Sequence, residues 1–75
     1  MTIYNVILSG QKPSDVQVFS YMDKEKAFES ARRLILYHND GSMEKMISEL
    51  RKSGKAFGTK GKKTFCILLT TGVVQ

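Results

Sequence analysis

Hydrophobic and polar residues alternate along residues 2–9 (TIYNVILS) with the two-residue period of a β-strand. The even-numbered positions from 4 onward are all apolar and the odd-numbered ones are mixed, so one face of this strand is expected to be buried. Residues 10–15 (GQKPSD) are typical of a turn, and residues 16–21 (VQVFSY) are again rich in β-branched and aromatic side chains. The pattern therefore predicts a β-hairpin at the start of the chain.

The next segment has the spacing of an amphipathic helix. Asp23 is a suitable N-cap, and Glu25 lies in the first turn, where a carboxylate complements the helix dipole. Residues 39–41 (NDG) are predicted to end the helix, because Asn and Gly readily take the left-handed conformation that closes helices. The predicted inward stripe follows the i, i+4, i+7, i+8, i+11 spacing and consists of Ala27, Ala31, Leu34, Ile35 and His38, widened by Phe28.

A second helix is predicted between a cap at Ser42 and a stop at Gly54. Arg51 and Lys52 fall in its last turn, where cations are favoured. Its apolar side chains recur at i, i+3, i+4 and i+7, at Met43, Met46, Ile47 and Leu50.

Residues 63–71 (KTFCILLTT) are apolar on both alternating faces, which is typical of a central strand. Residues 56–59 are interpreted as a short additional partner strand, joined to it by a two-residue connection at Lys60 and Gly61. The order of elements is then β-β-α-α-β with the extra short strand. This order predicts an α+β fold of two layers, a small, mainly antiparallel sheet with two helices on one face and strand 63–71 beside strand 2–9.

Length and composition are those of one globular domain spanning residues 1–75. The chain has 41% hydrophobic and 25% charged residues, and a domain near this size buries roughly 60% of the surface of its unfolded chain. The single cysteine, Cys66, cannot form an internal disulfide, which favours a reducing compartment. The first ten residues lack a basic segment, and no apolar run approaches the about 18 to 20 residues of a membrane span. We therefore expect a cytoplasmic protein that does not enter a membrane.

The positive charge is concentrated in one segment. Residues 51–64 hold six of the twelve basic residues and no acidic one, whereas the rest of the chain has six basic and seven acidic residues, so the whole net charge of +5 arises there. A focused basic patch attracts anionic partners more strongly than a diffuse one. The predicted binding residues in this segment are Arg51, Lys52, Lys55, Phe57, Lys60, Lys62 and Lys63.

The glycines and lysines of this segment do not form a nucleotide-binding P-loop. That loop needs a glycine at position 56, which is Ala56, and Ser or Thr at position 63, which is Lys63. It must also open a helix, whereas a strand is predicted to follow here. Nucleotide hydrolysis is therefore not expected.

The sequence Lys55-Ala56-Phe57-Gly58 resembles the start of the RNA-recognition-motif signature, and residues 3–8 resemble the companion motif on the first strand of that family. In that family aromatic side chains on a sheet face stack on bases while nearby lysines hold the backbone. The resemblance ends at residues 59–62, where the signature requires aromatic and aliphatic side chains, and the family has a helix where this chain has GQKPSD. The resemblance implies similar surface chemistry and not membership.

Catalytic and metal-binding residues are not evident. His38, the single histidine, lies at a predicted helix end, and Cys66 lies within a strand, so both are expected to be structural, the thiol being buried and inert. One His and one Cys without close spacing do not form a zinc site. We expect no catalytic residue, no metal and no cofactor.

The sequence thus predicts a small binding module without enzymatic activity, in which residues 51–63 contact an anionic partner, nucleic acid first. The alternative is a protein-binding modulator that contacts an acidic protein surface, an inhibitor or adaptor of a larger protein of the kind that phages and mobile elements encode. In the binding interpretations, three glycines of the segment (Gly54, Gly58, Gly61) would let a ligand approach the backbone. A third interpretation is a solvated loop without a binding role, with Phe57 and Phe65 in the core. Residues 72–75 either extend the last strand or offer an edge for pairing into a homodimer.

Overall fold

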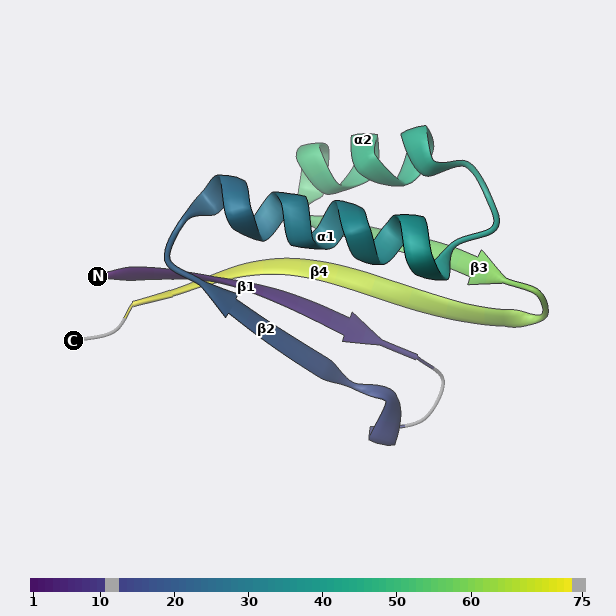
Figure 1. Ribbon diagram of the computed structural model, residues 1–75, viewed down its shortest axis with the longest axis horizontal. Helices are drawn as coiled ribbons and strands as arrows, with labels where there is room; N and C mark the ends of the chain where they lie inside the picture. The colour runs from purple at the N-terminus through teal and green to yellow at the C-terminus, as the bar shows by residue number, and fades with distance from the viewer. Residues whose placement is uncertain (11–12, 74–75) are drawn as a thin grey trace.

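The computed structural model describes residues 1–10 and 13–73. They form two layers, a four-stranded antiparallel sheet and two helices that lie on the same face of it (Figure 1), which confirms the predicted α+β class. The elements are β1 (Thr2–Ser9), the short 3-10 helix η1 (Pro13–Asp15), β2 (Gln17–Tyr21), α1 (Lys24–His38), α2 (Met43–Ser53), β3 (Lys55–Lys60) and β4 (Lys63–Val73).

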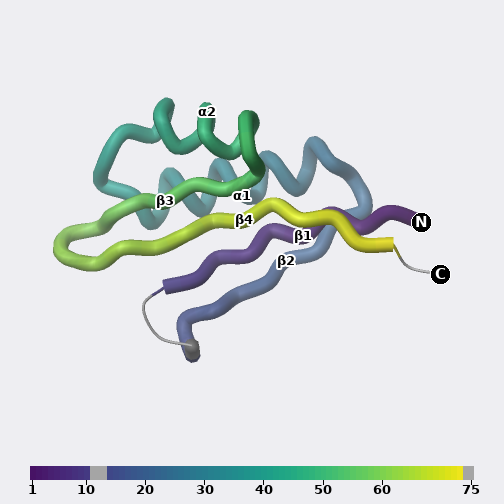
Figure 2. The backbone as a smooth tube through the Cα atoms, turned by 180° about the vertical axis from the view of Figure 1, so that it is seen from behind, coloured from purple at the N-terminus to yellow at the C-terminus, as the bar shows by residue number. Residues whose placement is uncertain are grey.

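The strand order is β2-β1-β4-β3, so β1 and β4 are the central strands and β2 and β3 form the edges (Figure 2). Val6 of β1 lies opposite Phe19 of β2 on one side and Leu69 of β4 on the other. The predicted pairing of the last strand with the first is therefore confirmed. Val73 pairs with Thr2, so β4 extends beyond the predicted end at 71, while residues 74–75 of the tail lie outside the described residues.

Local capping signals place both helices where the sequence predicts them. The Glu25 N–H donates to the Asp23 side chain at 2.8 Å, and the Lys45 N–H donates to the Ser42 hydroxyl at 3.3 Å. Each contact satisfies a backbone donor that the first helical turn leaves free. Gly54 ends α2 in the left-handed conformation, with a φ of 74°.

α1 ends with its C-cap at Asn39, within the predicted residues 39–41, but these residues do not close the helix in the predicted left-handed conformation. Asn39 is extended, with φ −109° and ψ 132°, and among the described residues only Gly54 and Gly61 have positive φ. The Asn39 side chain instead accepts hydrogen bonds from the N–H groups of Gly41 and Thr59, both at 3.2 Å. A contact with β3 therefore determines the course of this loop.

The hairpin between β3 and β4 forms, with its turn one residue later than predicted. The turn residues are Gly61 and Lys62, and Lys60 belongs to β3, where it pairs with Lys63. Gly61 has a φ of 63° and Lys62 does not have positive φ, the combination that a type II′ turn requires. Glycine is favoured at the first turn position, so the turn forms around Gly61 and not before it.

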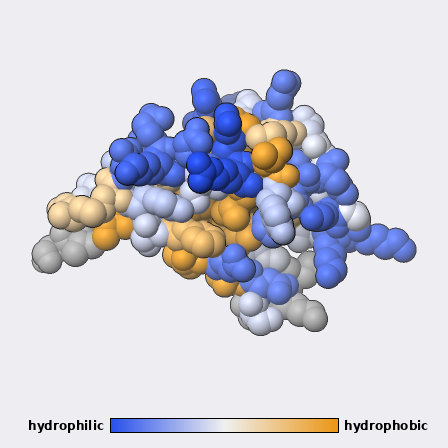
Figure 3. Space-filling view, viewed as in Figure 1, coloured by the Kyte–Doolittle hydropathy of each residue, from blue (hydrophilic) through white to orange (hydrophobic). Residues whose placement is uncertain are grey.

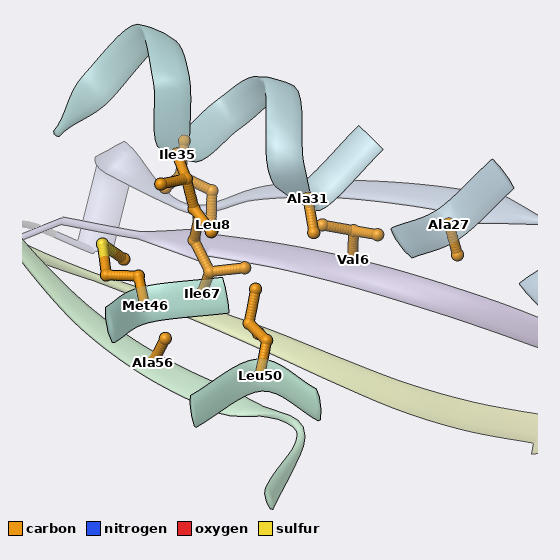
Figure 4. Close-up of a cluster of buried hydrophobic side chains, with 9 residues drawn as sticks. All are labelled: Val6, Leu8, Ala27, Ala31, Ile35, Met46, Leu50, Ala56 and Ile67. Carbon is orange, nitrogen blue, oxygen red and sulfur yellow. The ribbon is translucent and has the colours of Figure 1, made fainter. Parts of the chain in front are cut away.

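The core lies between the sheet and the helices (Figure 4). Ile35 of α1 and Ile67 of β4 are its largest fully buried side chains. Small alanines on the inward side of α1 let this helix approach the sheet closely, as close packing of a small core requires. Neither helix among the described residues is long and apolar enough to span a membrane. The buried residues are Val6, Leu8, Ala27, Ala31, Ile35, Met46, Leu50, Ala56 and Ile67.

Candidate functional site

The basic residues predicted to form one patch lie at two ends of β3. Arg51 and Lys52 are in the last turn of α2, just before the strand begins, whereas Lys62 and Lys63 are at the hairpin turn beyond its other end. Lys55 and Lys60, the first and last residues of β3, are five residue steps apart, which spans about 17 Å along a strand. Residues that are contiguous in sequence are therefore separated in space into two groups.

Strand alternation also divides the residues of β3 between the two faces of the sheet. Ala56 and Gly58 are buried beneath the helices, so Lys55 and Phe57 project from the opposite face, which no helix covers (Figure 2). Lys60 lies on the helical side. Of the seven predicted binding residues, the structure brings Lys55 and Phe57 together on the helix-free face.

Some of the predicted cations already contact partners within the chain. The Lys60 ammonium donates to the Tyr37 carbonyl oxygen at 3.2 Å and lies 5.5 Å from the centre of the Tyr37 ring. The Arg51 guanidinium lies 5.0 Å from the centre of the Phe28 ring. The Lys60 contact holds the end of β3 against α1, and the Arg51 contact links α2 to α1, because a cation over an aromatic face is weakly attractive.

Asp40 is a carboxylate at the hairpin that sequence reasoning did not connect with the basic segment. One of its oxygens accepts from the Gly61 N–H at 2.6 Å, and the other accepts from the Thr59 hydroxyl at 3.3 Å. The Asp40 N–H also donates to the Thr59 carbonyl at 2.9 Å. These contacts hold the loop before α2 on the hairpin and place a negative charge at the end of the strand that bears the lysines.

Two hollows on the helical side of the molecule contain both signs of charge. One, of about 420 Å³, is lined by His38, Lys60 and Lys63 together with Asp15. The other, of about 670 Å³, is lined by Lys24, Arg51 and Lys52 together with Glu25. An anion entering either hollow would meet a carboxylate, which opposes its binding.

The helix-free face has a different composition. The strand registers place Val18, Ile7 and Leu68 in a row across β2, β1 and β4, with Lys55 of β3 at its end. Phe57 is 63% exposed in the neighbouring row. Viewed from the side shown in Figure 3, hydrophilic residues gather over the helices, and hydrophobic surface lies below them. Ile3 of β1 lies on this face as well, and the other side chains there are small or polar, with hydroxyl or amide groups on Asn5, Ser9, Ser20, Thr59, Thr64 and Thr70.

Negative charge is absent from the strands of the sheet. In β1 to β4, as the structure describes them, no residue is Asp or Glu, and Lys55, Lys60 and Lys63 are the charged residues. Lys55 projects from the helix-free face, with its ammonium 5.1 Å from the centre of the Phe57 ring. This face therefore places an exposed aromatic ring and a cation side by side, with no carboxylate on the strands.

The interpretation of the basic segment as a solvated loop placed both Phe57 and Phe65 in the core. Phe57 is not in the core, whereas Phe65 is half-buried and packs against the core. Cys66 lies directly opposite Phe57 and is half-buried, not buried as expected, because it faces the side without helices. Burial raises the pKa of the Cys66 thiol, and the charge of Lys55 lowers this pKa in part. The thiol is thus neutral at physiological pH.

The three glycines of the basic segment have structural positions. Gly54 and Gly61 take positive φ at a helix end and at a turn. Gly58 is packed so closely that an added Cβ would lie 2.5 Å from Phe65 Cζ and 2.8 Å from Met46 Sδ. These positions account for all three glycines without a ligand that approaches the backbone.

Among the described residues, no group of three or more His, Cys, Asp or Glu side chains is arranged to hold a metal ion. Comparison with protein family models, with curated proteins and with solved structures gives no match.

Proposed function

We propose that this chain is a small binding module without enzymatic activity that holds single-stranded nucleic acid on the helix-free face of its sheet. The observation that carries the proposal is Phe57, 63% exposed on β3, with the Lys55 ammonium 5.1 Å from its ring centre. An unpaired base stacks on such a ring, and the neighbouring cation pairs with the phosphate that follows.

The energetics favour a single strand over a duplex. Stacking of one base on an aromatic side chain is worth about 1 to 3 kcal/mol, and it needs a base that is not already paired and stacked. Each lysine that neutralises a phosphate releases counterions, with a slope of about −0.7 in log K against log salt for single strands. Phe57 and Lys55 supply one contact of each kind.

The hairpin lysines extend this surface along the strand. Lys62, at the turn, lies about 20 Å along the chain from Lys55, which leaves room for a strand that crosses Phe57 to reach it. In this proposal Lys55 and Lys62 contact phosphates, whereas Lys52 lines the hollow on the helical side and Lys60 and Arg51 keep their partners within the chain.

The second candidate is a protein-binding modulator, and the row of Val18, Ile7 and Leu68 favours it. These apolar side chains lie on the same face without a helix over them, and exposed apolar patches are typical of protein contact sites. A protein partner requires a hydrophobic side chain at position 57, whereas a base requires an aromatic ring there. Substitutions at Phe57 therefore distinguish the two candidates.

The decisive assay is fluorescence anisotropy with a labelled single strand of about 12 nucleotides, as DNA and as RNA, against the matching duplex. We expect Phe57→Leu to weaken single-strand binding roughly 5- to 150-fold, the equivalent of the stacking energy, and Phe57→Tyr to retain it. Lys55→Gln should reduce the salt slope by about 0.7 between about 50 and 200 mM salt.

Matched control variants are available on the helices. Leu36→Ala removes an exposed apolar side chain from α1, and Lys45→Gln removes an exposed cation from α2. Neither should change the affinity beyond a general charge effect. Equal binding by the natural chain and Phe57→Leu would refute the proposal. Binding of a protein partner by Phe57→Leu, without nucleic-acid binding by either form, would favour the modulator.

The proposal assigns the protein to the cytoplasm, where single-stranded nucleic acid occurs and where a lone, half-buried cysteine stays reduced. Fractionation of cells that produce the tagged chain tests this assignment, which recovery from an extracellular or membrane fraction would contradict.

A further inference from the structure

The two edges of the sheet differ in how their backbone groups are satisfied. At β3, the N–H of Thr59 donates to Asn39, its carbonyl accepts from the Asp40 N–H, and the Lys55 carbonyl accepts from a serine hydroxyl. Charged residues also lie at both ends of this strand, at Lys55 and Lys60. The β3 edge is thus covered by loop contacts and flanked by charge, two devices that prevent strand addition.

The β2 edge has none of these protections. Figures 1 and 2 show β2 at the free edge of the sheet, with no segment of the described chain beyond it. The segment from Val16 to Met22 contains no charged residue and no proline. Val18 is 57% exposed and Met22 is 65% exposed. A neutral, unpaired strand of this kind is a template for another strand.

The register of the sheet determines which backbone groups of β2 point outward. The Leu69 N–H donates to the Gly54 carbonyl at 2.7 Å, so the odd-numbered residues of β4 bond to β3 and the even-numbered ones to β1. The odd-numbered residues of β1 bond to β4, so its even-numbered residues bond to β2. Their partners in β2 are odd-numbered, so the backbone N–H and C=O groups of the odd-numbered residues of β2 point toward β1. The N–H and C=O groups of Val18 and Ser20 therefore point outward, and no other described residue bonds to them.

We propose that the β2 edge is the contact surface for a second copy of this chain, through antiparallel β2–β2 pairing about a two-fold axis at Phe19. In this register Val18 lies opposite Ser20 of the other copy and bonds to it through the outward backbone groups. The two Phe19 side chains lie opposite each other as a non-hydrogen-bonded pair, and aromatic pairs stabilise such positions. The four-stranded sheet becomes a continuous eight-stranded one.

Charge favours a second copy at this edge over the rest of the surface. Each chain has a net charge of +5, so two copies repel at most approaches. The paired β2 strands (Gln17–Tyr21) contain no charged residue and so bring no like charges directly opposite each other. Asp15 and Asp23, which this register brings to the same end of the contact, lie outside the strand, in η1 and at the N-cap of α1. Self-pairing at β2 avoids the repulsion that pairing at the lysine-bearing β3 edge would cause.

The size of the contact limits its strength. One five-residue strand on each side covers less than the about 800 Å² per partner of a standard stable interface. We therefore expect a weak dimer that forms between micromolar and millimolar concentration. This inference does not rest on nucleic-acid binding, since Phe57 lies on β3 at the opposite edge of the sheet.

Sedimentation velocity over this concentration range tests the proposal on the natural chain. We expect the weight-average mass of the natural chain to rise toward that of a dimer as the concentration increases. Val18→Lys should raise the dimer dissociation constant at least about tenfold, since it places like charges beside each other at the contact. Ser48→Lys, which adds the same charge at an exposed position on α2, should associate more tightly than Val18→Lys and close to the natural chain. A monomer at millimolar concentration, or equal association by both variants, would overturn the proposal.

Cross-linking tests the register and does not depend on the strength of the dimer. In a Cys66→Ser background, Phe19→Cys should form a disulfide-linked dimer under mild oxidation, because opposite residues of a non-hydrogen-bonded pair have Cα atoms about 4.5 Å apart. Gln17→Cys is the matched control, since its counterpart lies about 13 Å away in this register and cannot be bridged. A faster dimer yield from Gln17→Cys than from Phe19→Cys would contradict the proposed pairing.

Discussion

Gly58 is the position at which β3 packs most closely beneath the helices. A Cβ built there would lie 2.5 Å from Phe65 Cζ, 2.8 Å from Phe65 Cε1 and 2.8 Å from Met46 Sδ. Ordinary carbon contacts lie at about 3.5 to 4.0 Å, so Gly58→Ala forces the two neighbouring side chains to move by about 1 Å. We expect Gly58→Ala to lower the stability of the chain.

The magnitude follows from two opposing effects. Overpacking of a well-packed site costs about 1 to 3 kcal/mol, and replacement of glycine stabilises by about 0.4 to 1 kcal/mol through the unfolded chain. At the midpoints of these two ranges the net loss is about 1.3 kcal/mol in the free energy of unfolding. For a domain of this size such a loss lowers the melting temperature by roughly 5 to 10 °C.

Urea denaturation followed by circular dichroism measures this loss, and a second variant tests its cause. Phe65→Leu removes the ring atoms that the added methyl group would contact, so Gly58→Ala should cost less in that background than in the natural chain. An unchanged or increased midpoint for Gly58→Ala alone would refute the reasoning. An equal cost in both backgrounds would show that Phe65 is not the obstacle.

Two further predictions concern the hairpin and the helix-free face. Asp40→Ala should lower the free energy of unfolding by about 1 to 2 kcal/mol through loss of its bonds to Gly61 and Thr59, and it should tighten binding of single strands. A urea midpoint equal to that of the natural chain would contradict this role. The raised pKa of Cys66 keeps its thiol protonated to a higher pH when folded, so its contribution to stability is present at neutral pH and lost at alkaline pH. The thiol should therefore react with an aromatic disulfide reagent more slowly in the folded than in the unfolded chain, and a bound single strand should slow it further. Equal rates in all three states would exclude this arrangement.

The sequence predicted the elements that depend on neighbouring residues. The caps at Asp23 and Ser42, the stop at Gly54 and the apolar stripes of both helices are local signals, and each of them lies where it was predicted. The pairing of β4 with β1 followed from the apolar character of both faces of β4. Short-range propensity and periodicity are sufficient for features of this kind.

The features that sequence reasoning missed depend on long-range contacts. Asp40 and Gly61 are separated by 21 positions, so no local pattern connects this carboxylate with the lysine segment. The same holds for Asn39, whose bond to Thr59 replaces the expected left-handed helix end. The division of the basic residues follows from the odd spacing between Lys55 and Lys60, which strand alternation places on opposite faces once β3 is known.

Methyl NMR during titration with a single-stranded oligonucleotide tests the use of the helix-free face most directly. Ile7 and Leu68 lie in the row of that face, whereas Leu36, 69% exposed on α1, reports on the helical side. We expect the Ile7 and Leu68 methyl signals to shift in a saturable, salt-sensitive manner while the Leu36 signals stay in place. Shifts at Leu36 without shifts at Ile7 and Leu68, or no shifts at saturating oligonucleotide, would contradict the proposed binding surface.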